Sequence, residues 1–309
     1  MPKNKKAKAL ILLSGGLDSM LAAKILQAQK IEVTGLVFAS AFFGAQAARV
    51  AARQLGIKLI VRNFSKKHLA LVKNPPHGYG KNMNPCIDCH ALMLKLAKKE
   101  MRRGKFDFVA TGEVINERPM SQNKRALKLV EKEAGLGGYL LRPLSAQLLP
   151  PTKPEKRGLV NRRQLLTISG RGRRPQLALA QKYKIKKFPT PAGGCRLTDP
   201  GFSGRLKQLL AKHKKAQADD IELLKVGRLF WTGKILLAVG RNHEENLKLK
   251  KLKKSGDLLA EAKTIPGPVI LIRGFAGRLK KKNLTDQISQ YLVKYNSKAK
   301  NQQIEIDWI

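Results

Sequence analysis

Short apolar runs alternate with helix-like stretches along the first half of this 309-residue chain. Alternation of strand and helix favours a parallel sheet with right-handed crossovers, because parallel strands can be joined only by long connections. The sequence therefore predicts an α/β fold with a doubly wound, Rossmann-like parallel sheet. The expected strands are Ala9–Leu13, Glu32–Phe38, Lys58–Arg62, Phe106–Ala110 and Tyr139–Arg142, and the helix-like stretches are Leu17–Gln29, Gly44–Leu55 and Ala91–Arg103.

A proline-rich stretch at residues 143–154 ends this alternation. Basic helical sequence follows it, and a different pattern begins at about residue 202. That pattern has apolar runs at Lys225–Phe230, Ile235–Val239 and Val269–Ile272 and a Lys-rich helical stretch at Glu244–Lys254. We expect two domains: residues 1–200, with a basic helical region near 155–200, and a smaller α+β domain at residues 201–309.

The chain is strongly basic, with 62 Lys and Arg against 21 Asp and Glu and a formal net charge of +41. These basic residues cover every predicted element, which favours a polyanionic partner, nucleic acid first, over a merely solvated lysine-rich surface. No apolar run approaches the roughly 20 residues that span a bilayer, and no cleavage site follows the basic start. We therefore expect a cytoplasmic protein with no membrane partner.

The segment Ser14–Ser19 breaks the chain between the first expected strand and the first helix. Gly15 and Gly16 allow a tight turn with no Cβ to obstruct a phosphate, and the following helix points free N–H groups at the anion. Asp18 fits such a loop if it binds a Mg²⁺ ion that accompanies the phosphates. The alternative is an ordinary polar turn with an acidic residue at the helix N-terminus.

Two more polar segments follow expected strands, at Phe38–Ser40 and at Thr111–Glu113. In an open parallel sheet, ligands bind beyond the carboxyl ends of the strands. We therefore expect three polar loops, one of them containing Gly112, to converge on one edge of the sheet.

Three cysteines are present, Cys86 and Cys89 in NPCIDC and Cys195 in AGGC. All three lie in sequence that looks like loop, beside Pro or Gly, and an odd number is poor material for structural disulfides. The residues alone leave three interpretations open. They are unconnected thiols, a zinc site with His90 as the fourth ligand, and a redox pair that leaves Cys195 unexplained.

The SGGLDS segment resembles the pyrophosphate-binding loop of the N-type ATP pyrophosphatases, or PP-loop family. The C-x-x-C pair with a distant Cys in a Gly-rich loop resembles the tRNA thiolation branch of that family. The resemblance covers about residues 8–200 and is strongest at SGGLDS, NPCIDCH, TGEV and AGGC. It implies ATP, Mg²⁺ and nucleotide contacts by Ser14, Gly15, Gly16, Asp18, Ser19, Ala39, Ser40 and Gly112.

The same resemblance implies an enzyme that uses ATP to adenylate a uridine carbonyl oxygen of tRNA, releases pyrophosphate, and replaces the oxygen with sulfur. Cys86, Cys89 and Cys195 would hold a [4Fe–4S] cluster or carry a persulfide supplied by a sulfur donor, and with Asp18 they are the expected catalytic residues. Thiolate attack needs a lowered pKa, which neighbouring Lys81 and Arg196 or a bound metal would supply. The alternatives are an amidating ligase acting on a small molecule and a non-catalytic RNA- or ribosome-binding protein.

Other polar residues carry weaker signals. Asp88, between two cysteines, is expected to orient a cluster or substrate or to be a solvated acid. Substrate contact and ordinary helix capping are both open for Arg118, Ser121 and Gln122. The segment Gly170–Gln176 is interpreted as a phosphate-binding loop or a solvated charge cluster. We expect His68 and His77 to be surface residues without partners.

The C-terminal domain resembles the NFACT-R RNA-binding domain over about Lys225–Gly274. The resemblance rests on ILLAVGRNHEEN and IPGPVILIRG. It implies RNA backbone contacts by Arg241-Asn242 and the Lys248–Lys254 run; the alternative is an Asn-capped helix with an exposed lysine face. The matching residues are Gly240, Arg241, Asn242, Asn246, Pro266 and Gly267.

Overall fold

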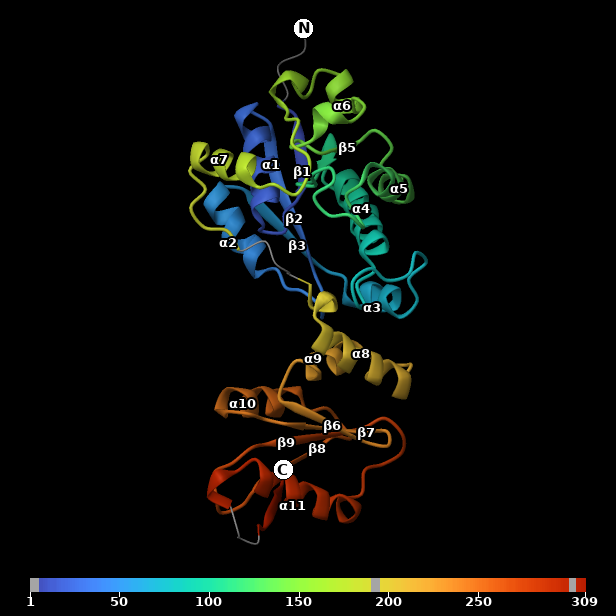
Figure 1. Cartoon of the computed structure of the whole chain (residues 1–309), viewed down its shortest axis with the longest axis vertical. Helices are drawn as coiled ribbons and strands as arrows, with labels where there is room; N and C mark the ends of the chain where they lie inside the picture. The colour runs from blue at the N-terminus through green and yellow to red at the C-terminus, as the bar shows by residue number, and fades with distance from the viewer. Residues whose placement is uncertain (1–5, 190–194, 300–303) are drawn as a thin grey trace. The chain divides into compact units, whose positions relative to one another are not determined.

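The computed structural model describes residues 6–189, 195–299 and 304–309 of the chain. The chain divides into two compact units, Met1–Thr198 and Asp199–Ile309, and each is described by itself (Figure 1). No helix among the described residues combines the length and apolarity needed to cross a membrane.

The first unit is built on a five-stranded parallel sheet of order β3-β2-β1-β4-β5. The predicted parallel α/β fold is therefore confirmed. The strand order reverses beside β1, so the loops after β1 and β4 open at the same edge, which is where such sheets bind ligands. The strands are β1 Lys8–Leu12, β2 Glu32–Ala39, β3 Lys58–Asn63, β4 Phe108–Ala110 and β5 Leu140–Leu141.

Helices cover both faces of this sheet (Figure 1). Successive residues of a strand point to opposite faces, so Ala9 and Ile11 pack in the core under α1, α2 and α7, whereas Leu10 packs in the core under α4 and α5. The helices are α1 Leu17–Ala28, α2 Gln46–Leu55, α3 Ser65–Lys73, α4 Cys86–Arg103, α5 Lys124–Ala134, α6 Lys153–Lys156 and α7 Arg174–Lys182, with short 3₁₀ helices at Ala146–Leu148, Arg162–Gln164 and Arg196–Thr198.

The start of α4 corrects one prediction. Cys86 and Cys89 were expected in a loop before a helix at Ala91, but both lie in the first turn of α4. Pro85 occupies the N-cap position, where a missing N–H costs nothing, and Asp88 provides the acidic residue that favours a first turn. The two thiols are consequently held by rigid helical backbone.

The second unit contains a five-stranded antiparallel sheet of order β10-β8-β9-β7-β6. Leu237, Ile270 and Ile272 from the sheet share a core with Ile288 and Leu292 of α11. The elements are α8 Pro200–Lys212, α9 Ala218–Leu223, β6 Arg228–Thr232, β7 Ile235–Val239, α10 His243–Leu252, β8 Leu258–Ala262, β9 Ile270–Gly274, α11 Thr285–Lys294 and β10 Ile306–Trp308, with 3₁₀ helices at Lys281–Asn283 and Ser297–Ala299.

The motif expected to contact RNA in this unit is occupied by internal contacts. The Asn242 side chain caps α10, and the guanidinium of Arg241 pairs with Glu245. Asn246 donates to the carbonyl of Gly267 at 3.0 Å. These contacts match the capped-helix interpretation of the motif, and the NFACT-R resemblance itself stays a prediction.

Candidate active site

The Ser14–Ser19 loop connects β1 to α1 in a tight, internally bonded turn. The N–H of Gly16 donates to Ser14 Oγ at 3.2 Å, and Ser19 Oγ donates to the carbonyl of Gly16 at 2.8 Å. Gly15 has φ +87°, and a Cβ there would lie 2.4 Å from the carbonyl carbon of Ala47. Only glycine therefore fits, and no side chain of a described residue caps the N-terminus of α1 that follows.

Gly112, on the loop after β4, lies directly against this turn. A Cβ at Gly112 would lie 2.4 Å from the backbone nitrogen of Ser19 and 2.5 Å from the carbonyl carbon of Asp18. Gly112 therefore sets the approach of the β4 loop to the first turn of α1.

Buried polar atoms without hydrogen-bond partners gather around Asp18. Burial raises the pKa of the Asp18 carboxyl, while the nearby guanidinium groups of Arg173 and Arg118 act in the opposite direction. Gln176 faces Asp18 from α7. The partnerless atoms in this group are Asp18 Oδ1, Arg173 Nε and both amide atoms of Gln176.

Such atoms are costly to bury and typically mark a place where a ligand completes the hydrogen bonding. Glu117 belongs to the same cluster, because burial and the adjacent Asp18 raise the pKa of its carboxyl. Two guanidinium groups, one amide and two carboxyls thus converge on the first turn of α1. This arrangement suits a phosphate chain accompanied by a divalent cation.

His68 is fully buried, so its expected place on the surface is wrong. Its Nδ1 lies 2.9 Å from Ser40 Oγ, and its Nε2 lies 3.4 Å from Cys89 Sγ. The ring stacks on Phe64 at 4.7 Å between centroids. Burial lowers its pKa to about 4, so the imidazole is neutral near pH 7.

The three cysteines converge although Cys195 is far away in sequence. The turn after Cys195 is tied down by two backbone hydrogen bonds, from Arg196 to Phe42 and from Met83 to Leu197, both 3.2 Å. The thiols are close enough to influence one another's ionisation, since Cys195 and Cys86 both add to the raised pKa of Cys89. The remaining residues of the AGGC motif, 192–194, lie outside the described residues.

The expected lowering of the thiol pKa values by Lys81 and Arg196 is wrong. Burial raises the pKa of Cys86 and Cys89, and raises that of Cys195 to about 11. The cation that opposes this effect at Cys86 and Cys195 is Arg118, not Lys81 or Arg196. A buried thiolate needs a compensating positive charge, such as a metal ion, beside it.

A zinc site with His90 is not assembled, because no three ligating atoms of the described residues Cys86, Cys89, Cys195 and His90 lie within 4.8 Å of one another. His90 Nδ1 instead lies 3.1 Å from Glu113 Oε1.

Glu113 is held by three side chains, because Arg142 and Thr111 also donate to its carboxylate, each at 2.9 Å. Burial opposes ionisation of Glu113, but the contacts with Arg142, His90 and Thr111 outweigh it and lower the pKa of Glu113 to about 2. Glu113 therefore anchors the loop after β4 inside the protein.

Asp88 also has a structural partner. Its carboxylate accepts the backbone N–H of His77 at 3.1 Å and lies 2.6 Å from His77 Nδ1, while His77 Nε2 lies 3.1 Å from Glu133. The hydrogen bond to Asp88 raises the pKa of His77. The imidazole of His77 thus lies between the carboxylates of Asp88 and Glu133 and fastens the first turn of α4 to the segment before it.

Comparison with known proteins identifies relatives of the first unit. Residues 7–152 match the family described as "tRNA methyl transferase HUP domain". The tRNA-specific 2-thiouridylase MnmA of Serratia proteamaculans is 28% identical over an alignment of 194 residues, which covers 54% of this chain and 52% of that protein. The protein of the same name from Chloroflexus aggregans is 31% identical over 124 residues, or 34% of each chain. The chain spans about half the length, or less, of these curated relatives.

Two solved structures show partial likenesses. A predicted subunit of tRNA methyltransferase from Methanocaldococcus jannaschii is 19% identical, with 44% of this chain and 67% of that one covered and a TM-score of 0.35. A 4-thiouridine synthetase in complex with RNA and ATP is 18% identical, with 58% and 52% covered and a TM-score of 0.37. These values are too low to support any inference about function.

Proposed function

We propose that this protein is an ATP-dependent, cytoplasmic tRNA thiolation enzyme, because residues 7–152 match the family described as "tRNA methyl transferase HUP domain". Its substrate is a uridine whose carbonyl oxygen is adenylated and then replaced by sulfur. The observation that carries the proposal is the set of buried, partnerless polar atoms around Asp18, in the first turn of a helix whose N-terminus no described side chain caps. The convergence of three thiols provides the second half of the chemistry.

Each half has defined residues. The N-terminus of α1, with Ser14 and Ser19, binds the pyrophosphate portion of ATP, and Arg173 supplies an unpaired donor to the phosphates. Asp18 holds the Mg²⁺ that screens their charge. The uridine carbonyl oxygen attacks the α-phosphorus, the bond to pyrophosphate breaks, and the base carbon becomes electrophilic.

Sulfur then adds to that carbon and AMP leaves. Cys86, Cys89 and Cys195 would together bind a [4Fe–4S] cluster, which supplies an open iron for sulfide. In the persulfide route, the terminal sulfur on one cysteine attacks the base carbon. A second cysteine thiolate then cleaves the S–S bond, which releases thiouridine and leaves a disulfide that needs an external reductant. His68 contacts Cys89 and Ser40, so it joins the thiol group to the end of β2.

The test is pyrophosphate release from ATP, with and without unmodified total tRNA, combined with mass spectrometry of the digested tRNA for 2-thio- and 4-thiouridine. RNA-dependent release together with a thiouridine supports the proposal. Release that needs no RNA indicates a small-molecule ligase. No release under any condition contradicts an enzymatic function.

Cysteine variants separate the two sulfur routes. Anaerobically purified wild type is compared with Cys86→Ala, Cys89→Ala and Cys195→Ala for iron, sulfide and absorbance near ~400 nm, where such clusters absorb. A content of about four irons and four sulfides per wild-type chain, lost in every variant, would establish the cluster. Wild type without iron after reconstitution, but with a persulfide detectable by mass spectrometry, establishes the other route.

A further inference from the structure

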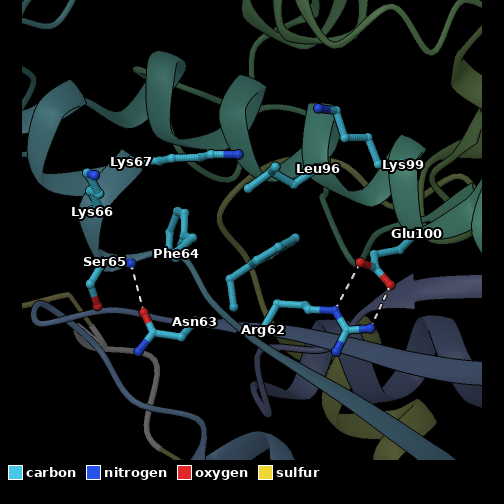
Figure 2. Close-up of a pocket in the computed structure, with 10 residues that line it drawn as sticks. Arg62, Asn63, Phe64, Ser65, Lys66, Lys67, Leu96, Lys99 and Glu100 are labelled. Carbon is cyan, nitrogen blue, oxygen red and sulfur yellow. Dashed lines mark hydrogen bonds and ion pairs between the residues drawn. The ribbon is translucent and has the colours of Figure 1, made fainter.

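A basic pocket lies at the carboxyl end of β3, outside the residues assigned above to the ATP phosphates and the thiols (Figure 2). It has a volume of about 320 Å³ and is bounded by the end of β3, the start of α3 and the second half of α4. Its lining residues are Phe38, Arg62, Asn63, Phe64, Ser65, Lys66, Lys67, Leu96, Lys99 and Glu100.

The pocket carries unbalanced positive charge. Lys66, Lys67 and Lys99 are exposed at its rim, and none has an ion-pair partner among the residues that the structure describes. Glu100 is the one carboxylate in the lining, and two nitrogens of Arg62 donate to it at 2.9 Å each. Arg103 donates to the same carboxylate, so Glu100 does not offset the lysines.

The chemistry of the rim favours phosphates spaced along a strand over one free anion. A small anion is held best by a converging or bidentate donor set, and the only guanidinium here, that of Arg62, is already committed to Glu100. Separate ammonium groups on flexible stems act as point charges, which is how Lys contacts nucleic acid backbones. The apolar lining residues Phe38, Phe64 and Leu96 offer no side-chain donors of their own.

The position of the pocket connects it to the candidate active site. Phe38 directly precedes Ala39 and Ser40 at the end of β2. Phe64 stacks on His68, whose ring also lies beside Cys89. The pocket therefore adjoins the aromatic group that separates it from the thiols.

We propose that Lys66, Lys67 and Lys99 bind backbone phosphates of the RNA substrate next to the base that reacts. The inference rests on the proposed function, because it takes the substrate to be RNA. It adds a defined contact surface on the first unit, separate from any RNA contact made by residues 199–309.

The experiment measures the affinity of the full chain for fluorescein-labelled unmodified tRNA by anisotropy, over a range of salt concentrations. The test variant is K66Q/K67Q/K99Q, in which Gln keeps much of the side-chain length and removes three charges. The control R125Q/K128Q/K132Q removes three charges from the exposed side of α5. Binding of Mg-ATP is measured for every protein to establish that the fold and nucleotide site are intact.

For the test variant, the slope of log K against log salt should become shallower by about 2 to 3, and affinity at ~0.1 M salt should fall at least about tenfold. The control should change both quantities much less. Equal effects of the two triple variants would overturn the inference and leave only a general charge effect. Wild type that binds Mg-ATP but no tRNA would overturn the proposed RNA substrate as well.

A second variant changes the charge in the opposite direction. Glu100→Gln removes the carboxylate that occupies Arg62, which frees a guanidinium at the pocket and should tighten tRNA binding a few-fold, with a steeper salt dependence. Unchanged binding in this variant contradicts the proposal. Binding of inorganic phosphate that depends on the three lysines, with tRNA affinity unaffected, would identify a small-anion site instead.

Discussion

The imidazole Nε2 of His68 lies 3.4 Å from the sulfur of Cys89. The other ring nitrogen lies 2.9 Å from Ser40 Oγ, so one buried, neutral ring connects the end of β2 with the first turn of α4. In the thiol form of Cys89, a ring nitrogen accepts the S–H; when the sulfur is anionic or bound to metal, the ring can donate to it instead. His68 is therefore a positioning residue that keeps the Cys89 sulfur hydrogen-bonded in either state.

His68→Phe should preserve the packing on Phe64 and remove the hydrogen bond to Cys89. We expect alkylation of Cys89 by iodoacetamide in the metal-free protein to slow by about tenfold, because loss of one hydrogen bond worth about 1.4 kcal/mol disfavours the thiolate. Mass spectrometry of labelled peptides measures Cys89 and Cys86 in the same sample. Equal slowing of both cysteines would indicate a general loss of structure, and His68→Gln should restore part of the rate.

Asp18→Asn should separate stability from activity. The carboxylate has a buried oxygen without a partner and a pKa that burial raises, so the neutral amide should leave the melting temperature unchanged or slightly higher. Pyrophosphate release should fall at least about a hundredfold, because a neutral amide is a weak ligand for Mg²⁺. A large drop in melting temperature, measured by calorimetry, would show instead that Asp18 stabilises the fold.

The sequence predicted those parts of the site whose chemistry is local. The Ser14–Ser19 turn is specified by two glycines between a strand and a helix, and the structure has this loop where it was expected. His68 could not be recognised, because the segment Ser65–Lys73 has lysines on both sides of it and no local pattern reveals a buried ring. Its burial follows from tertiary contacts with Phe64 and Cys89, which lie on different elements.

The pKa values of the thiols could not be predicted from local sequence either. Neighbouring cations in the sequence suggested depressed values, but ionisation depends on burial, and burial is set by how the turn at Cys195 packs on α4 and the β2 loop. Arg118, the cation that opposes the raised pKa of Cys86 and Cys195, is separated from Cys89 in the sequence by the rest of α4, by β4 and by a loop. That Arg118 lies near the thiols follows only from the folded structure.

Gly112→Ala should disrupt the nucleotide loop without touching any ligand-binding side chain. The added methyl would meet the backbone of Ser19 at 2.4 Å, and backbone cannot move aside as a flexible side chain does. We expect a loss of about 1–3 kcal/mol in unfolding free energy and weaker binding of Mg-ATP by tenfold or more. Gly137→Ala is the matched control, because nothing lies within 4 Å of its added Cβ. Comparable loss of ATP binding in both variants would refute this account of Gly112.

Glu113 should make stability depend on pH in acid. Its pKa is about 2 in the folded protein and 4.5 ordinarily, so the unfolded chain binds the proton more readily. The stabilisation is therefore complete above pH 4.5 and is lost, by about 3 kcal/mol, as the pH falls toward 2. Glu113→Gln leaves Arg142 buried without its closest carboxylate and should destabilise by about 3–5 kcal/mol at pH 7. Urea unfolding at neutral pH and at successively lower pH values should show the difference between wild type and variant shrinking as the pH falls through this window. A difference that stays constant would mean that Glu113 is not held ionised by Arg142.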